Sequence, residues 1–187
     1  MDAGTASSAI KVIVVMGVSG SGKSTIASML AQRLHWVYED ADWFHPQSNI
    51  EKMHHGEPLT DQDRWPWLHA IAAWIDATRR AEGHGVCACS ALKRAYRDIL
   101  IGDRRDVSLV FLKGDRDLIA RRIAARADHF MPPALLDSQF KTLEEPQPDE
   151  RAIVVSIAPH PREIVEDIVR KAGLEPMQAK AGPAVQR

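Results

Sequence analysis

The sequence predicts an α/β fold in which a five-stranded parallel sheet is covered by helices on both faces. Five short runs rich in Val, Ile and Leu alternate along the chain with segments of helical periodicity. Continuous apolar strands of this kind occur where both faces of a sheet are buried, which favours a parallel sheet. The length of 187 residues suits a single domain with one core.

The first half of the chain supplies two strands and two helices. KVIVVMG at 11–17 reads as a buried strand, and WVYED at 36–40 reads as a second, shorter one. Between them, KSTIASMLAQRL at 23–34 places Ile26 and two leucines on one face of a helix. A longer helix is expected at 67–81, where two tryptophans seven residues apart share a face and pack.

The second half repeats the alternation. Strands are expected from GVCACS at 85–90, VSLVFL at 107–112 and AIVVSI at 152–157. Helical stretches are expected at 116–127, 133–143 and 162–171. The ends at 1–9 and 175–187 carry small residues and prolines without periodicity, so we expect them to be flexible and to flank one domain at 10–174.

Composition and charge argue against several classes of protein. The formal net charge of -1 gives no basic excess for nucleic acid, and no apolar run approaches the roughly 18 residues of a membrane span. The start, MDAGTASSAI, lacks the basic and apolar segments of a signal peptide. We therefore expect a cytoplasmic protein without nucleic-acid or membrane partners, in which Cys87 and Cys89 are buried free thiols.

The stretch MGVSGSGKST at 16–25 carries the motif G-x-x-x-x-G-K-[ST] between a predicted strand and a predicted helix. Its glycines allow a nest of inward-facing N–H groups, and the following helix adds its positive end, so that a polyphosphate is held by main chain. Lys23 is expected to reach the β- and γ-phosphates, and the Ser24 hydroxyl to ligate Mg²⁺. The residues expected to bind ATP are Gly17, Ser19, Gly20, Ser21, Gly22, Lys23, Ser24 and Thr25.

The motif alone is compatible with a switch, a motor or a kinase. A GTP switch normally carries N-K-x-D and D-x-x-G, but the single asparagine, Asn49, is followed by Ile50, and D-x-x-G is absent. Motor ATPases usually carry an apolar strand that ends in an acid, whereas GVCACS ends in cysteine and serine. The acid that manages Mg²⁺ must therefore come from elsewhere in the chain.

Two acids, Asp40 and Asp42, end the second predicted strand or follow it. On an extended chain both would point the same way, and the carboxyl ends of parallel strands flank the ligand crevice. We expect Asp42 to orient a substrate hydroxyl and to take its proton late, because an aspartate is too weak a base to deprotonate an alcohol beforehand. Asp40 is expected to assist Mg²⁺ through water. A solvated acidic turn is the alternative for both.

The run DADWFHPQSNIEKMHHGEPLTDQDRWPWL closely resembles the gluconokinases, which are small P-loop kinases that phosphorylate the terminal hydroxyl of gluconate. CSALKRAYRD, FLKGD and HFMPPALLDSQFKTLEEP match the same family, so that the resemblance covers about residues 12–172. It implies a P-loop NTPase fold like that of nucleoside monophosphate kinases, ATP and Mg²⁺ as cosubstrates, a 6-phosphogluconate product and often a homodimer.

The resemblance also implies roles for particular residues. Asp42 aligns with the proposed base of the family. The segment 43–66 aligns with the substrate side of the site, through His45, Asn49, Lys52, Asp63 and Arg64.

The residues themselves agree with an anionic polyhydroxy substrate, which needs a cation and several hydrogen-bonding groups. Ser48 and Glu51 form an S-x-x-E capping box, which predicts a short helix bearing Asn49 and Lys52. Arg64, Lys93 and Arg97 are further candidates for the carboxylate, and Lys93 closely follows the third strand. Solvated helix faces are the alternative for each of these charges.

A lid is expected at about 122–143. Arg122 and Arg126 are four apart and share a helix face, from which they would neutralise charge on the transferring phosphoryl group. The resemblance places His129, a substrate-side residue, in the tip of this lid. The family often has lysine and glycine before that histidine, whereas this chain has Ala127 and Asp128, which leaves the chemistry of the lid open.

These observations together predict an ATP-dependent gluconokinase that transfers the phosphoryl group directly, in line. One alternative is another small-molecule kinase of the same architecture, such as a shikimate kinase, although the three glycines expected after its third strand are replaced here by CSALK. A second alternative is an ATP-binding module without turnover, against which Asp42 and the lid arginines argue.

Overall fold

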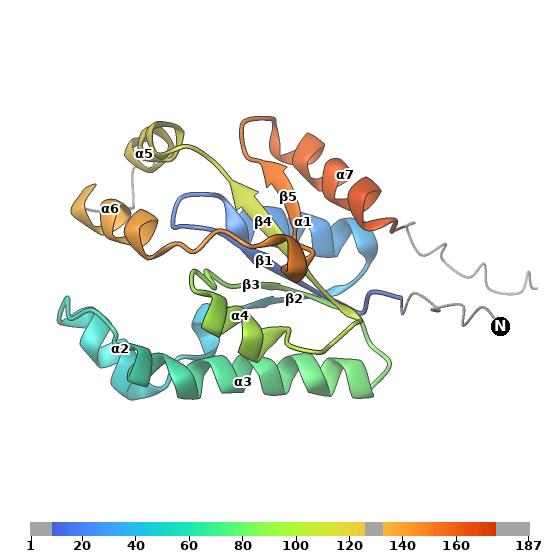
Figure 1. Cartoon of the computed structure of the whole chain (residues 1–187), viewed down its shortest axis with the longest axis horizontal. Coiled ribbons are helices and arrows are strands. Elements are labelled where there is room, and N and C mark those ends of the chain that lie inside the picture. Colours follow the sequence, from blue (N-terminus) through green and yellow to red (C-terminus); the bar gives the residue numbers. More distant parts are fainter. Residues whose placement is uncertain (1–8, 126–132, 175–187) are drawn as a thin grey trace, which may run out of the picture.

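The computed structural model describes residues 9–125 and 133–174, and in this part it confirms the five-stranded parallel sheet (Figure 1). The strands run in the order β2-β3-β1-β4-β5, so β1 lies in the middle and β2 and β5 form the edges. Their bounds are Val12–Met16 for β1, Val37–Asp40 for β2, Gly85–Ala88 for β3, Val107–Lys113 for β4 and Ile153–Ser156 for β5. The predictions for the two chain ends lie outside the described residues, apart from residue 9.

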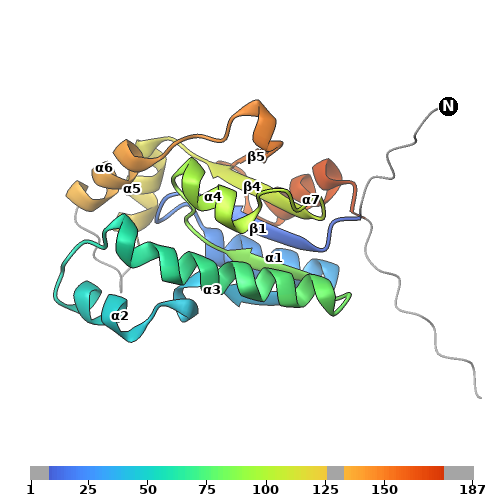
Figure 2. The same ribbon diagram turned by 60° about the horizontal axis from the view of Figure 1, so that its bottom comes forward.

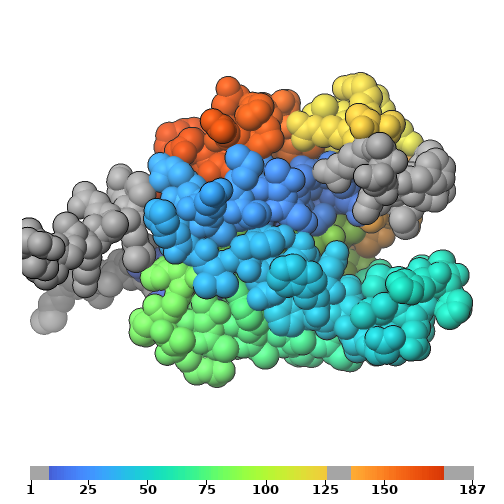
Figure 3. Space-filling view, turned by 180° about the vertical axis from the view of Figure 1, so that it is seen from behind, coloured from blue at the N-terminus to red at the C-terminus, as the bar shows by residue number. Residues whose placement is uncertain are grey.

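Helices cover both faces of the sheet. One face carries α1 and α7, and the opposite face carries α3 and α4 (Figures 1 and 2). Seen from behind, α7 lies along one side of α1 (Figure 3). The helices span Lys23–Leu34 (α1), Gln47–His54 (α2), Asp61–Arg80 (α3), Arg94–Leu100 (α4), Arg116–Ala124 (α5), Pro133–Thr142 (α6) and Pro161–Ala172 (α7).

The central strand explains why its sequence is apolar at every position. Ile13 and Val15 pack in the core cluster beneath α1 and α7, whereas Val12, Val14 and Met16 pack in the cluster beneath α3 and α4. All five side chains are fully buried. A strand between two helical layers has no solvent face, so its sequence lacks polar alternation.

The structure differs from the sequence prediction at three helices. Helix α3 begins at Asp61 instead of residue 67, because Thr60 and Asp63 form a capping box and Pro66 lies inside the helix. Helix α2 begins at Gln47 after Pro46, so the predicted capping box at Ser48 is wrong. The seven-residue helix α4 was not predicted, because two turns give too little periodicity.

The functional elements gather where the strands end. The loop between β1 and α1, and the helices α2, α5 and α6, all lie at the carboxyl end of the sheet (Figure 1). The carboxyl end of a parallel sheet is where α/β domains bind ligands. Within the described ranges, no helix has both the length and the apolar character that a membrane span needs.

Candidate active site

The loop between β1 and α1 is shaped by glycines and by the helix packed against it. Gly20 has a φ of +80°, and a Cβ atom there would lie 2.6 Å from Cγ1 of Ile123 in α5. Gly22 has a φ of +94° and directly precedes α1. Left-handed backbone favours glycine at both positions, and the close contact with Ile123 favours it further at Gly20. This loop at 17–22, hereafter the phosphate loop, therefore has the form expected of a main-chain phosphate nest at a helix N-terminus.

Lys23 and Ser24 begin α1 and face different partners. The Lys23 ammonium donates to the Val18 carbonyl at 3.2 Å, which folds this side chain back along the loop. The Ser24 hydroxyl donates to Oδ2 of Asp40, the last residue of β2, at 3.1 Å. This contact joins the phosphate loop to the acid predicted at the second strand.

Asp40 is the centre of a small oxygen cluster. Its Oδ2 atom also accepts a hydrogen bond from the Tyr38 hydroxyl at 2.9 Å. Burial, and then the Asp40 carboxylate, raise the pKa of Tyr38 to about 12, so Tyr38 remains a donor. Carboxylate and hydroxyl oxygens are the ligands that Mg²⁺ prefers. The contacting Ser24 hydroxyl and Asp40 carboxylate therefore have the ligand chemistry that fits this ion.

Asp42 lies next to Asp40 but not on an extended chain. The strand ends at Asp40, whose carboxylate accepts the Asp42 N–H at 3.1 Å and caps a 3₁₀ turn at Ala41–Phe44. The prediction that Asp40 and Asp42 lie on one extended chain is therefore wrong. Asp42 is nevertheless exposed at the carboxyl end of β2, the end of the sheet that carries the phosphate loop.

His45 is held by the first turns of α3. Its ring stacks on Trp67 with 4.4 Å between ring centroids, and the Trp67 indole N–H donates to the Ala41 carbonyl at 2.6 Å. Asn49 lies 3.4 Å from Nδ1 of His45 and donates to the Asp63 carbonyl at 2.9 Å. Burial lowers the pKa of His45, opposed by Asp42. Trp67 packs as predicted. It also stacks on His45, a contact that the seven-residue spacing of the tryptophans does not reveal.

Lys52 and Asp63 form an ion pair between α2 and α3. The ammonium donates to Oδ1 of Asp63 at 2.7 Å. This contact and the hydrogen bonds from Thr60 lower the pKa of Asp63 to about 2. Asp63 also caps α3, so one carboxylate both starts the helix and holds Lys52.

Two predicted cations converge on Asp61, which sequence reasoning missed. Lys93 donates to both carboxylate oxygens of Asp61, at 2.9 and 2.7 Å, and Arg64 lies 3.7 Å from Oδ1. The Tyr96 hydroxyl donates to Oδ1 at 2.5 Å. The Lys93 hydrogen bond is the main cause that lowers the pKa of Asp61. Because Asp61 and Lys93 are 32 residues apart, no local signal connects them.

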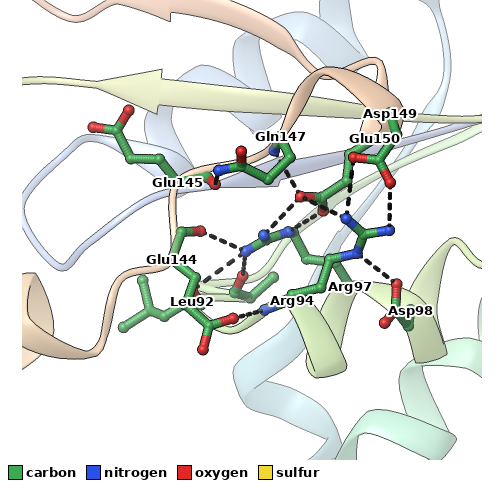
Figure 4. Close-up of polar contacts among 10 residues, drawn as sticks. Leu92, Arg94, Arg97, Asp98, Glu144, Glu145, Gln147, Asp149 and Glu150 are labelled. Carbon is green, nitrogen blue, oxygen red and sulfur yellow. Dashed lines mark hydrogen bonds and ion pairs between the residues drawn. The ribbon is translucent and has the colours of Figure 1, made fainter.

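Arg97 does not belong to this group, so its predicted substrate role is wrong. Its side chain is 2% exposed, and its guanidinium is paired with Glu150 at 2.5 Å. One Nη atom also donates to the carbonyls of Ala91, Leu92 and Glu144. Figure 4 shows the guanidinium enclosed by these acceptors. Arg97 follows Lys93 by one turn in sequence, but it turns into the protein and has a structural role.

Of the three lid residues predicted to act in the site, Arg122, Arg126 and His129, the structure describes Arg122. Its Nη2 atom donates to the carbonyl of Ile157 at 2.6 Å, which ties α5 to the end of β5. Ile123 on the same helix contacts Gly20 of the phosphate loop. Arg126 and His129 lie outside the described residues, as do Ala127 and Asp128.

The described site combines a glycine-shaped loop at a helix N-terminus, a hydroxyl in contact with a carboxylate, a second, exposed carboxylate and a cluster of two cations. Such a set can bind a polyphosphate at one side and an anionic hydroxyl compound at the other. Positioning and charge neutralisation supply most of the catalysis in phosphoryl transfer, which this set is suited to provide.

Comparisons with known proteins identify a matching family model, similar sequences and similar structures. A family model described as an AAA domain matches residues 12–146. The chain is 47% identical to a gluconokinase of Gluconobacter oxydans, over 84% of this chain and 89% of that one. A gluconokinase structure from Sinorhizobium meliloti superposes with a TM-score of 0.80 at 43% identity, and the match covers 87% of this chain and 91% of that one.

A shikimate kinase from Bacteroides thetaiotaomicron has a TM-score of 0.62 at 18% identity, over 89% of this chain and 100% of that one. This lower similarity shows a shared fold and confirms the predicted architecture, but it gives no support to a shared substrate.

Proposed function

The chain belongs to the gluconokinase family, and from this membership we infer that it transfers the γ-phosphate of ATP to the 6-hydroxyl of D-gluconate. The products are 6-phospho-D-gluconate and ADP. The shikimate alternative is not favoured, because that similarity is limited to the fold. A module without turnover is not favoured either, because the relatives are enzymes by name.

The phosphate loop is the proposed site for ATP. Main-chain N–H groups between Gly17 and Thr25 hold the phosphates, and Lys23 donates to the β- and γ-oxygens while its ammonium keeps its contact with the Val18 carbonyl. Ser24 and Asp40 are the residues that would hold Mg²⁺, directly or through water. When bound, the ion would offset the charge of the phosphate oxygens. The observation that carries the proposal is the 3.1 Å contact between Ser24 and Asp40, because it joins the ATP side to the strand end bearing Asp42.

Asp42 is the proposed partner of the substrate hydroxyl. Asp42 is exposed just beyond the carboxyl end of β2, where its carboxylate could accept a hydrogen bond from the attacking alcohol. In a loose transition state the hydroxyl loses its proton late, so Asp42 mainly orients the oxygen and then takes the proton.

The gluconate carboxylate is proposed to bind where Lys93 and Arg64 meet. Asp61 occupies these cations in the described structure, so a substrate carboxylate would share or replace its contacts. His45, Asn49 and Lys52 are the proposed polar contacts for the hydroxyl chain. Arg122 and Arg126 are proposed to neutralise the transferring group, with His129 beside the substrate. We also propose a cytoplasmic homodimer, and sedimentation velocity would test the assembly.

A coupled assay for ADP release tests the acceptor. We expect rapid release with ATP, Mg²⁺ and D-gluconate, and only background release with shikimate or without an acceptor. Equal release in all three reactions would contradict the assignment.

Asp42→Asn tests the proposed role of this carboxylate. We expect kcat to fall by at least about 100-fold, the lower end for loss of a general base. Because Asp42 is exposed, the melting temperature should stay the same. A variant with full activity would exclude Asp42 from the chemistry, while leaving the gluconate assignment to the acceptor assay.

A further inference from the structure

Gln139 on α6 is hydrogen-bonded to the phosphate loop through both ends of its carboxamide. Its Oε1 atom accepts the main-chain N–H of Ser19 at 2.7 Å, and its Nε2 atom donates to the Ser19 hydroxyl at 2.8 Å. The two residues are 120 positions apart, and the contact is partly buried. A loop expected to offer its N–H groups to phosphate thus has one of them taken by a side chain.

The peptide unit that Gln139 holds is also the one that contacts Lys23. The carbonyl of Val18 and the N–H of Ser19 belong to the same planar group and point in opposite directions. The carbonyl accepts the Lys23 ammonium at 3.2 Å and the Ser21 N–H at 3.2 Å, while the N–H donates to Gln139. A rotation of this peptide would therefore break contacts on both sides at once.

Helix α6 gives Gln139 a fixed position. Leu136 is buried in the core cluster beneath α1 and α7, and Phe140 packs against the same cluster. The carboxamide is therefore a rigid support for the loop. Groups that are already oriented need no rearrangement as charge develops in the transition state.

We propose that Gln139 is a positioning residue for phosphoryl transfer, which sets the orientation of the Val18–Ser19 peptide and thereby the place of the Lys23 ammonium. The proposal rests on the phosphate-binding part of the proposed function. An ammonium has three N–H donors, so support from the Val18 carbonyl is compatible with donation to phosphate oxygens. Without Gln139, the Ser19 N–H loses its acceptor, and the peptide is free to turn away from Lys23.

Gln139→Met tests this role, because methionine keeps the length and helix propensity of glutamine but makes neither hydrogen bond. We expect kcat to fall about tenfold, as for the loss of one or two neutral hydrogen bonds, while KM for gluconate and the melting temperature stay nearly unchanged. Gln139→Ala is a second variant and should give the same loss. The matched control is Asp137→Asn, which weakens another contact of α6, the ion pair with Arg116 of α5, and should keep the wild-type kcat.

A double-mutant cycle with Lys23→Met asks whether the effect passes through Lys23. Affinity for a nonhydrolysable ATP analogue is measured without gluconate, so the result does not depend on which acceptor the enzyme uses. We expect Gln139→Met to weaken binding about fivefold in the wild type and less than twofold beside Lys23→Met.

Equal losses in both backgrounds would overturn the proposal, as would wild-type kcat in both Gln139 variants or the same loss in Asp137→Asn. Failure of gluconate phosphorylation in the wild type, with coupling still present in the cycle, would instead contradict only the proposed acceptor.

Discussion

His45 shows how a single side chain at this site takes its properties from neighbours on other elements. Its ring is stacked on Trp67 of α3 and lies beside Asn49 of α2. Burial lowers its pKa, Arg64 acts in the same direction, and Asp42 opposes them. The net direction means that the folded protein favours the neutral ring.

The shifted His45 predicts a defined dependence of stability on pH. The folded pKa lies below the ordinary value of 6.5, so the unfolded chain takes up the proton first as pH falls. The contribution of the neutral ring is fully present above 6.5 and is lost as pH falls toward the folded pKa. Urea unfolding at several pH values should show this loss in the wild type and a smaller one in His45→Gln. An NMR titration that placed the ring pKa at or above the ordinary value would contradict it.

Prediction from sequence succeeds at single residues where the signal is local. Lys23 and Ser24 lie at the start of α1 because the motif and its strand and helix are adjacent in the chain. Asp61 and Gln139 had no such signal, because their partners are 32 and 120 residues away. Arg97 was assigned to the wrong role, since spacing cannot tell which side of a short helix is buried.

At the scale of elements, the buried ion pair of Arg97 joins α4 to the segment before β5. Glu150 lies in a 3₁₀ turn at Pro148–Glu150, and Arg97 also binds the carbonyl of Glu144 at the start of this segment. Figure 4 shows Arg94 reaching the same turn from the solvent side, where it pairs with Asp149 at 2.8 Å. One turn is therefore held by a buried arginine and an exposed one.

The two arginines predict very different costs of removal. Arg97→Met removes the 2.5 Å ion-pair partner of the buried Glu150 and leaves this carboxylate with the more distant Arg94, 3.7 Å away, which should lower the free energy of unfolding by about 3–5 kcal/mol. Arg94→Met is the matched control, because solvent screens its exposed pairs with Asp98 and Asp149 and its contact with Glu150 is longer, at 3.7 Å, so its removal should cost much less. Urea unfolding of both variants measures the difference. Equal costs would mean that the buried pair of Arg97 and Glu150 stabilises the fold no more than the ion pairs of Arg94.

The sequence predicts elements accurately where a helical segment is long and periodic or where a strand is a continuous apolar run. All five strands were found, and the expected helix at 23–34 matches α1. The start of α3 was placed too late because proline disfavours a helix interior, yet Pro66 is tolerated a few residues after the capped start. The predicted short helix bearing Asn49 and Lys52 is confirmed as α2, but it begins at Gln47 after Pro46 and not at a capping box formed by Ser48.

At the scale of the whole molecule, the sheet order decides which distant segments meet. Because β3 lies between β1 and β2, the carboxyl ends of these three strands and the segments that follow them meet at one end of the sheet. They carry the phosphate loop, Asp40 and Lys93. The alternation of strands and helices predicts a parallel sheet, but it does not specify this order. The fold class was therefore accessible from sequence, whereas the pairing of Lys93 with Asp61 required the three-dimensional arrangement.

Nucleotide binding should stabilise the whole domain, since the phosphate loop exists only in the folded state. ADP at about 100 times its Kd should add about 2.7 kcal/mol to the free energy of unfolding. For a chain of this size each kcal/mol raises the melting temperature by about 2–4 °C, so a shift of about 5–10 °C is expected. Lys23→Met should reduce the shift, because its ammonium no longer reaches the phosphates. Arg94→Met, which alters ion pairs with Asp98, Asp149 and Glu150, none of them in the phosphate loop, should keep the full shift. If Lys23→Met gave the same shift as the wild type, ADP would be bound somewhere other than the phosphate loop.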